Sequence, residues 1–273
     1  MTGNDLTVVI PNYNKSGFIV QCVESIEEQT LKPAVILIID DASTDDSKSV
    51  IEGLSKRYSN IETVFLPENS GVSAVRNRGL SLVKTEFVTF IDADDLYYDK
   101  RKLENETALI NEHGEDTIAY SVTAVLHGDD TKTVTKLKKP SYYLKGNIRF
   151  SLLTMSKWDS VMRDYIIKAE LLRNAGGYAE GHSLFEDYEL LLKLSARYRF
   201  FCTGCFGTGY REGNGISKER ENEHDRIINE MIKAELENET LFYRIRAGLV
   251  KSFYTAKRKT KDFIRKRLLN RGQ

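Results

Sequence analysis

This chain of 273 residues lacks three features, and each absence excludes a class of protein. No run of apolar residues approaches the roughly 18 that a membrane-spanning helix requires. The first residues contain no basic region followed by an apolar stretch, which a signal peptide would have. The three cysteines are too few, and odd in number, for a disulfide framework. We therefore expect a cytoplasmic protein with reduced thiols.

The formal net charge is zero, but the charge is unevenly distributed. Residues 244–273 contain eleven Lys and Arg and a single acid, Asp262. The remaining 243 residues therefore hold 29 of the 40 basic and 39 of the 40 acidic residues, a net charge of −10. The sequence predicts a basic C-terminal arm on an acidic body, and an anionic partner for the arm.

Strand-like and helix-like segments alternate through the first hundred residues. Short runs rich in β-branched residues predict strands at 6–10, 35–39, 61–66 and 87–91. Apolar residues at helical spacing predict helices at 18–29, about 45–58 and 72–83. Strands that are apolar throughout are typical of a parallel sheet. The predicted fold class is α/β, with a mostly parallel sheet flanked by helices on both faces.

The second half is less regular. It predicts helices at 101–113, 168–174 and 186–198, and strands at 117–126, 131–137, 161–167 and within 200–210. From Ser217 onward no proline interrupts a helical extension, although Gly248 costs a helix about 1 kcal/mol and could break it. We therefore divide the chain into residues 1–100, 101–216 and a basic, amphipathic extension, 217–273.

Three carboxylates, Asp92, Asp94 and Asp95, follow the strand predicted at 87–91. Buried carboxylates are costly, so the strand must end there and place the acids at its tip. Clustered oxygen ligands suit Mg²⁺ or Mn²⁺. An acidic turn facing water is the alternative, and the spacing of Asp92 and Asp94 does not by itself decide between the two.

Two other predicted strands also end in polar residues. Tyr13 follows the first strand and Asp41 the second. The carboxyl ends of parallel strands share one edge, where α/β proteins bind ligands. Tyr13 can stack on a base, Asp41 can accept a hydrogen bond from a ring N–H, and a metal at Asp94 would neutralise a diphosphate. The three ends together predict a nucleoside-diphosphate site.

These residues occur in an order that closely resembles the family 2 glycosyltransferases. The matching segments run through the first hundred residues and resume later in the chain, and they are residues 9–14, 39–45, 69–71, 74–79, 91–95, 176–178, 185–190 and 210–211. The resemblance implies a GT-A type fold and an inverting, metal-dependent hexosyl- or N-acetylhexosaminyltransferase that uses nucleotide-diphosphate sugars. Residues 1–100 would form the nucleotide-sugar half, and 101–216 the acceptor and catalytic half.

The resemblance also implies roles for individual residues. The nucleotide-binding residues would be Pro11, Tyr13, Asp41, Arg76, Asp92 and Ala93, with Asp94 as the direct ligand of Mn²⁺ or Mg²⁺. Asp187 would be the general base, because an ionised carboxylate at a helix start suits a base, although such residues are often only helix caps. Arg211 and Ser217 would contact the diphosphate. Many relatives have a His shortly after the position of Arg211, where this chain has Glu212, Gly213 and Asn214.

The basic arm leaves three interpretations open. Leu241, Ile245, Leu249 and Phe253 fall four residues apart beside basic residues, a pattern typical of a helix at an anionic membrane surface. The same stripe could pack on the body, and nucleic acid is a third, weaker candidate because the acidic body opposes it. We predict a peripheral enzyme at the inner face of the plasma membrane, acting on a glycan or lipid-linked acceptor in bacterial polysaccharide or lipopolysaccharide synthesis.

Two alternatives come from other classes of protein. A catalytically inactive module would bind the nucleotide sugar without transferring it. Residues 36–41 also resemble the acidic strand end of a phosphorylated receiver domain, but the spacing of Asp92, Asp94 and Asp95 does not supply the partners that such a domain needs. A dehydrogenase is disfavoured because residues 207–209 lack the G-x-G-x-x-G spacing.

Overall fold

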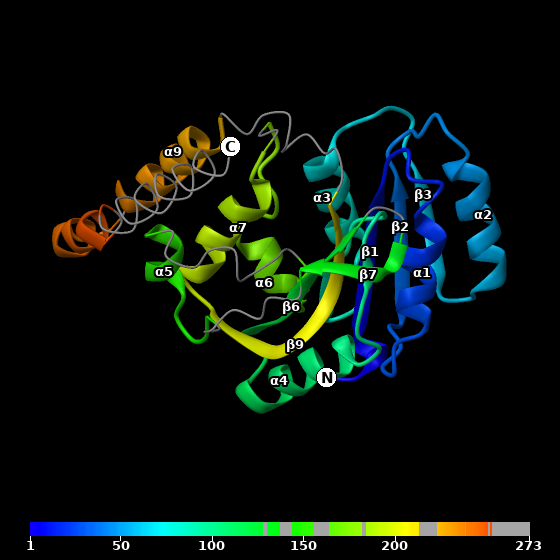
Figure 1. Ribbon diagram of the computed structural model, residues 1–273, viewed down its shortest axis with the longest axis horizontal. Coiled ribbons are helices and arrows are strands. Elements are labelled where there is room, and N and C mark those ends of the chain that lie inside the picture. The colour runs from blue at the N-terminus through cyan, green and yellow to red at the C-terminus, as the bar shows by residue number, and fades with distance from the viewer. Residues whose placement is uncertain are drawn as a thin grey trace, which may run out of the picture.

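A five-stranded sheet forms the centre of the molecule (Figure 1). The computed structural model describes residues 1–127, 130–136, 144–154, 164–181, 184–212, 223–237, 239–250 and 252. The strand order is β3-β2-β1-β4-β8. The first four strands are mutually parallel, and they are β1 (Leu6–Asn12), β2 (Val35–Asp40), β3 (Ile61–Phe65) and β4 (Phe87–Phe90). The predicted mostly parallel sheet is confirmed.

Helices cover both faces of this sheet, because successive side chains of a strand point to opposite faces. Val8 and Ile10 of β1 pack with α1 (Ile19–Glu27), α2 (Ser47–Arg57) and α4 (Lys102–His113). Val9, between them, packs on the other side with α3 (Val72–Leu82) and the later helices α6, α7 and α9. The α/β fold class with helices on both faces is therefore confirmed.

Helix α3 approaches β1 unusually closely. A Cβ atom at Gly79 would lie 2.5 Å from Cγ1 of Val9, so only glycine fits there. This contact sets the position of α3, which carries Arg76 toward the carboxyl end of the sheet.

A second, four-stranded sheet has the order β5-β9-β6-β7. Its strands are β5 (Leu96–Tyr97), β6 (Thr117–His127), β7 (Asp130–Lys136) and β9 (Arg199–Glu212). The long, curved β9 crosses the middle of Figure 1. It pairs parallel to β6 and antiparallel to β5. Residues 200–210, predicted to form one or two strands, belong to this single strand of 14 residues.

The elements before the site follow the predictions with some shifts. The strand predicted at 161–167 is represented in the described residues by β8 (Ile167–Lys168), which runs antiparallel to β4. The remaining helices are α5 (Arg149–Leu153), α6 (Ala169–Asn174), α7 (Glu186–Ser195) and α9 (His224–Glu237), and a short 3₁₀ helix, η1 (Gly3–Asp5), precedes β1. Gly176 and Gly177 end α6 with φ angles of 87° and 66°, as expected of helix-terminating glycines.

The C-terminal extension breaks at a different place from the one predicted. Gly248 lies inside the helical residues 241–250, so the prediction of a break there is wrong. The break falls at 239–240, where the Thr240 hydroxyl accepts a hydrogen bond from the backbone N–H of Tyr243 and so caps a new helix. Ser217 and residues 253–273 lie outside the described residues. Within the part that the structure describes, no helix is both long enough and apolar enough to cross a bilayer.

Candidate active site

The loops that follow β1 and β2 are locked together at the carboxyl edge of the sheet. Nδ2 of Asn12 donates to Oδ1 of Asp40 over 2.7 Å, and the backbone N–H of Asn14 donates to the hydroxyl of Ser43 over 2.9 Å. Asn14 and Ala42 both have positive φ angles, 52° and 57°. Such angles are uncommon outside glycine, and here cross-loop hydrogen bonds support the strained turns.

Tyr13 lies between the two pinned asparagines, and its side chain remains in solvent. It is 45% exposed, whereas Asn12 beside it is buried. Pro11 is buried and pairs in register with Ile39 of β2. The structure thus presents an aromatic ring on a fixed loop, and the ring is available to stack on a planar ligand.

Asp41 is only 3% exposed, and the loop before α3 holds its carboxylate. Oδ1 accepts hydrogen bonds from the backbone N–H and the hydroxyl of Ser70, at 2.8 and 2.9 Å. Oδ2 accepts one from the backbone N–H of Gly71 at 2.9 Å, where a φ of 84° favours glycine. The carboxylate therefore has a fixed orientation at the edge of the sheet, and the segment 69–71 supplies that orientation.

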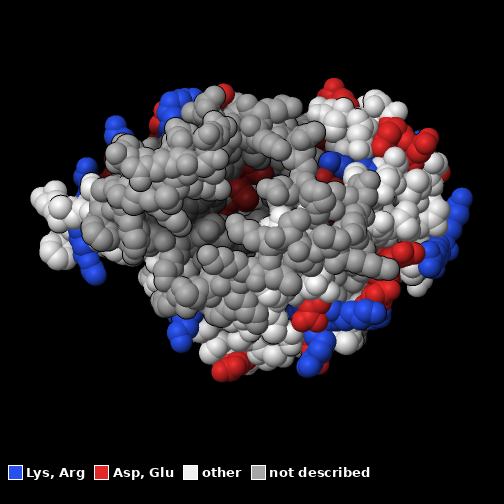
Figure 2. All heavy atoms as spheres, in the orientation of Figure 1, with Lys and Arg blue, Asp and Glu red and all other residues white. Residues whose placement is uncertain are grey.

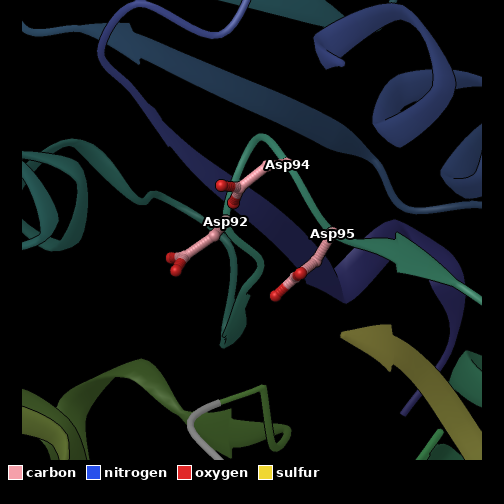
Figure 3. Close-up of side chains that lie close together, drawn as sticks. All are labelled: Asp92, Asp94 and Asp95. Carbon is pink, nitrogen blue, oxygen red and sulfur yellow. The ribbon is translucent and has the colours of Figure 1, made fainter. Parts of the chain in front are cut away.

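Asp92, Asp94 and Asp95 lie together on the loop that links β4 to β5 (Figure 3). One carboxylate oxygen from each falls within 4.8 Å of the others. Ala93 between them is buried. Asp94 forms an ion pair of 2.6 Å with Lys15 on the loop after β1, and Asp95 accepts a hydrogen bond of 3.0 Å from the backbone N–H of Arg211. The acids thus sit beside the loop that carries Tyr13.

Arg76 is buried between the two halves of the chain. One terminal nitrogen donates to Asp92 at 2.8 Å and the other to Glu186 of α7 at 2.7 Å. The guanidinium also lies 5.2 Å from the centre of the Tyr178 ring. Arg76 therefore fixes the start of α7 against the acidic loop, and this role was not apparent from the sequence.

Asp187 lies in the first turn of α7, next to Glu186. The helix is preceded by Phe185, whose left-handed backbone (φ 65°) makes no side-chain capping bond. The backbone N–H of Tyr188 donates to Asp187 over 2.7 Å. The Glu186–Arg76–Asp92 bridge brings this carboxylate to the same edge as the acidic cluster, since adjacent residues cannot lie far apart.

Arg211 does not reach out of the site as predicted. It is buried, its guanidinium donates to Gln21 of α1, and it lies 5.2 Å from the centre of the Phe18 ring. These contacts fasten β9 to the start of α1 and place the Arg211 backbone against Asp95. Ser217, the other predicted diphosphate contact, lies outside the described residues.

The acidic loop affects one buried thiol. Cys22 of α1 donates to the backbone oxygen of Asp92 over 3.6 Å. Burial raises the pKa of the Cys22 thiol well above its usual range, and the charges of Asp95, Asp94 and Asp92 raise it further, while Arg211 opposes them. Since a thiolate is the nucleophilic form of cysteine, Cys22 is a packing residue, as predicted.

A small pocket opens beside the acidic loop, at the junction of the two sheets. Its lining residues are Ile91, Asp92, Asp95, Thr123, Asp164, Thr208 and Tyr210. The hydroxyl of Thr208 donates to Asp164. Figure 2 shows acidic side chains deep in a hollow near the middle of the visible face. The sequence gave no reason to select Asp164 or Thr208, because both come from segments with no recognisable motif.

The donor set of the acidic loop fits a divalent cation. Carboxylate oxygens within a few ångströms of one another are the ligands that Mg²⁺ and Mn²⁺ prefer. Asp92 and Asp94 are partly exposed and so accessible, whereas Asp95 is buried. Two of the three carboxylates already face a basic side chain, Arg76 for Asp92 and Lys15 for Asp94.

The geometry agrees with what comparison to known proteins finds. The family model described as "Glycosyl transferase family 2" matches residues 7–173, more than half of the chain. The chain belongs to the family 2 glycosyltransferases. It is therefore a transferase, and the receiver-domain alternative is wrong.

Similar members of the family differ greatly in length. An uncharacterized glycosyltransferase of Haemophilus influenzae is 28% identical over 71% of this chain and 75% of its own. An uncharacterized glycosyltransferase of Rickettsia conorii is 36% identical over 69% of this chain and 31% of its own. The teichoic acid poly(glycerol phosphate) polymerase of Staphylococcus epidermidis is 28% identical over 70% of this chain but 26% of its own. The chain thus spans only part of several relatives.

Solved structures resemble the fold at low sequence identity. The crystal structure of S. aureus TarS residues 1–349 in complex with UDP-GlcNAc superimposes with a TM-score of 0.69 and 19% identity, over 93% of this chain and 72% of that one. At this identity the likeness shows the fold alone. It supports the assignment of the GT-A type.

Proposed function

We propose that this glycosyltransferase moves a sugar from a nucleotide-diphosphate donor, with UDP-sugars as the first candidates, to a hydroxyl of a glycan or lipid-linked acceptor, with inversion at the sugar carbon. The observation that carries the proposal is the gathering of Tyr13, Asp41 and Asp94 at one sheet edge. The loops of β1 and β2 are hydrogen-bonded to each other, and Lys15, two residues after Tyr13, reaches Asp94.

The nucleotide would lie across this edge. Tyr13 offers an exposed ring for stacking, and Asp41 a carboxylate whose orientation is fixed by Ser70 and Gly71. Asp92 is placed to receive the ribose or a metal-bound water, with Arg76 holding its carboxylate. The names of the structural neighbour with UDP-GlcNAc and of the teichoic acid polymerase support a UDP-sugar donor and a cell-surface glycan product.

Asp94, with Asp92 beside it, would hold Mn²⁺ or Mg²⁺. When bound, such a cation stabilises the charge that develops on a departing diphosphate. Asp187 would take the proton from the acceptor hydroxyl. Its place in the first turn of α7 favours the ionised form that a base needs, because the helix N-terminus stabilises negative charge. Inversion requires this base on the face opposite the leaving group, as in other inverting sugar chemistry.

A donor-hydrolysis screen tests the proposal. We expect the full chain to release UDP from at least one UDP-sugar in the presence of Mn²⁺, and expect EDTA to abolish the release and added Mn²⁺ to restore it. Asp94→Ala should remove the metal-dependent turnover, whereas Asp46→Ala, in the exposed loop before α2, should not. Binding of UDP without release from any donor would favour the inactive nucleotide-sugar-binding module. Release that persists in EDTA would exclude the cation.

We also propose that the C-terminal extension binds an anionic membrane surface. Four large apolar residues of the helical segment 241–250, at the left of Figure 1, lie exposed, with exposed fractions of 55% to 77%, and they are Leu241, Phe242, Ile245 and Leu249. Tyr243 faces inward, where its ring meets Phe150 edge-on. The apolar residues therefore point away from the body, and basic residues such as Arg244 accompany them. This arrangement is typical of interfacial helices.

Vesicle co-sedimentation tests the membrane proposal. Replacing Leu241, Phe242, Ile245 and Leu249 together by Ser should weaken binding to phosphatidylglycerol-containing vesicles about tenfold or more, because each lost side chain removes apolar area from the interface. Neutral phosphatidylcholine vesicles should bind the unaltered chain more weakly. Transfer to a water-soluble acceptor should remain unchanged and serves as the folding control. Equal vesicle binding by both proteins would exclude this face as the anchor.

A further inference from the structure

The Lys15–Asp94 ion pair joins two loops that the proposed donor must enter. Nζ of Lys15 lies 2.6 Å from Oδ2 of Asp94, and both side chains are partly exposed, at 39% and 31%. Asp94 is the residue assigned as the direct metal ligand. The ammonium group therefore occupies one of the two oxygens that the cation would use.

The backbone of Lys15 is anchored, so only its side chain can move. The Lys15 N–H donates to the hydroxyl of Ser47 over 3.3 Å, and the Lys15 carbonyl oxygen accepts hydrogen bonds from Phe18 and Ile19, which open α1. Its neighbour Ser16 donates to Asp45 over 3.0 Å. The ammonium can thus leave Asp94 only by rotation of its flexible stem, within reach of the space above the acidic loop.

A divalent cation at Asp94 and the ammonium of Lys15 exclude each other from the same oxygen. They also repel one another at such short range. A donor diphosphate changes this balance, because its oxygens offer the ammonium a new anionic partner beside the metal. The presence of the diphosphate should therefore favour both the cation on Asp94 and the departure of Lys15.

We propose that Lys15 is a positioning residue that holds Asp94 until the donor arrives and then turns to the diphosphate, so that cation and nucleotide bind together. This inference rests on the proposed function. It makes the affinity for the cation depend on the nucleotide, and by reciprocity the affinity for the nucleotide depend on the cation to the same extent.

The test measures Mn²⁺ dissociation constants by the electron paramagnetic resonance signal of free Mn²⁺, with and without UDP. Lys15→Gln should bind Mn²⁺ alone about two- to fivefold more tightly than the unaltered chain, the range expected for the loss of a partly exposed ion pair. The tightening of Mn²⁺ binding caused by UDP should be smaller in this variant. Lys15→Arg should retain most of the dependence on UDP. Lys100→Gln, which breaks the exposed pair with Glu28, removes the same charge and should change neither value.

The outcomes separate this inference from the function on which it rests. If Lys15→Gln binds Mn²⁺ with the same affinity and the same response to UDP as the unaltered chain, while Asp94→Asn has lost Mn²⁺, the role of Lys15 is overturned and the metal site stands. If the unaltered chain binds no Mn²⁺ even with UDP, or Asp94→Asn binds it equally well, the metal assignment fails and this inference falls with it.

Discussion

Replacement of Asp187 by Asn is expected to lower the rate of sugar transfer by about 10²- to 10⁴-fold, the usual contribution of a general base. Asn has nearly the same shape as Asp, so it should preserve the first turn of α7 and the hydrogen bond from Tyr188. It cannot accept the proton of the acceptor hydroxyl. Affinity for UDP should remain unchanged, because the nucleotide residues lie on the loops of the parallel sheet.

The measurement compares kcat and KM for donor and acceptor with the dissociation constant of UDP from calorimetry. A fall in kcat with unchanged UDP binding marks an interaction made only in the transition state. Glu189→Gln is the matched control: Glu189 lies in the same turn, pairs with Lys193 of the same helix, and its change should leave the rate close to normal. Transfer that survives in Asp187→Asn would place the base elsewhere.

Replacement of Lys102 by Met is expected to lower the free energy of unfolding by about 3–5 kcal/mol, the cost of leaving a buried charge without its partner. Lys102 and Glu106 are both fully buried in α4, and Nζ lies 2.8 Å from each carboxylate oxygen of Glu106. The same ammonium donates to the backbone oxygen of Asp164 over 2.9 Å. Chemical denaturation at neutral pH measures the loss.

The pH dependence of this loss has a definite sign. Burial raises the pKa of Glu106 from 4.5 to about 7, and Lys102 opposes the rise. Without Lys102 the native pKa climbs further above the unfolded value, so the folded variant holds a proton that the unfolded chain releases. Its stability therefore falls as the pH rises above 4.5. We expect the deficit relative to the unaltered chain to be larger at pH 8 than at pH 5.

A double variant tests the cause. Lys102→Met combined with Glu106→Leu removes both charges and should regain most of the lost stability, because an apolar pair of similar size can replace a buried ion pair. A double variant as unstable as Lys102→Met alone would show that packing or the bond to Asp164 carries the effect, and not the unpaired carboxylate. Neither residue contacts the carboxylates of the acidic loop in any described hydrogen bond or ion pair, so activity per folded molecule serves as the control.

The parallel half of the fold could be predicted because its signals are local. β-Branched runs end in polar residues at every strand of that sheet, and the acids after β4 can only lie at a tip. The second sheet could not be predicted, since pairing between β6 and β9 joins residues about eighty positions apart. The glycines of β9 were a signal of a kind: a Cβ atom at Gly207 would lie 2.4 Å from that of Ser121, and one at Gly209 would lie 2.7 Å from Leu126.

The candidate site was predictable in the same uneven way. Tyr13, Asp41 and Asp94 were selected because short motifs carry them, and the structure brings their loops together. Lys15 and Glu186 were missed as partners because an ion pair across the fold leaves no trace in local spacing; Arg76 and Glu186 are 110 residues apart. Arg211 was placed wrongly in the open because its charge suggested exposure, whereas its guanidinium is buried against α1.

The Arg76 bridge has a consequence for how such an enzyme can change its acceptor. The guanidinium ties three segments, α3, the acidic loop and the start of α7, into one triangular brace. Within that brace the spacing between the donor side and Asp187 is inherited unchanged. New acceptor preferences must then evolve on segments outside it, so that the reaction stays constant while its products diversify.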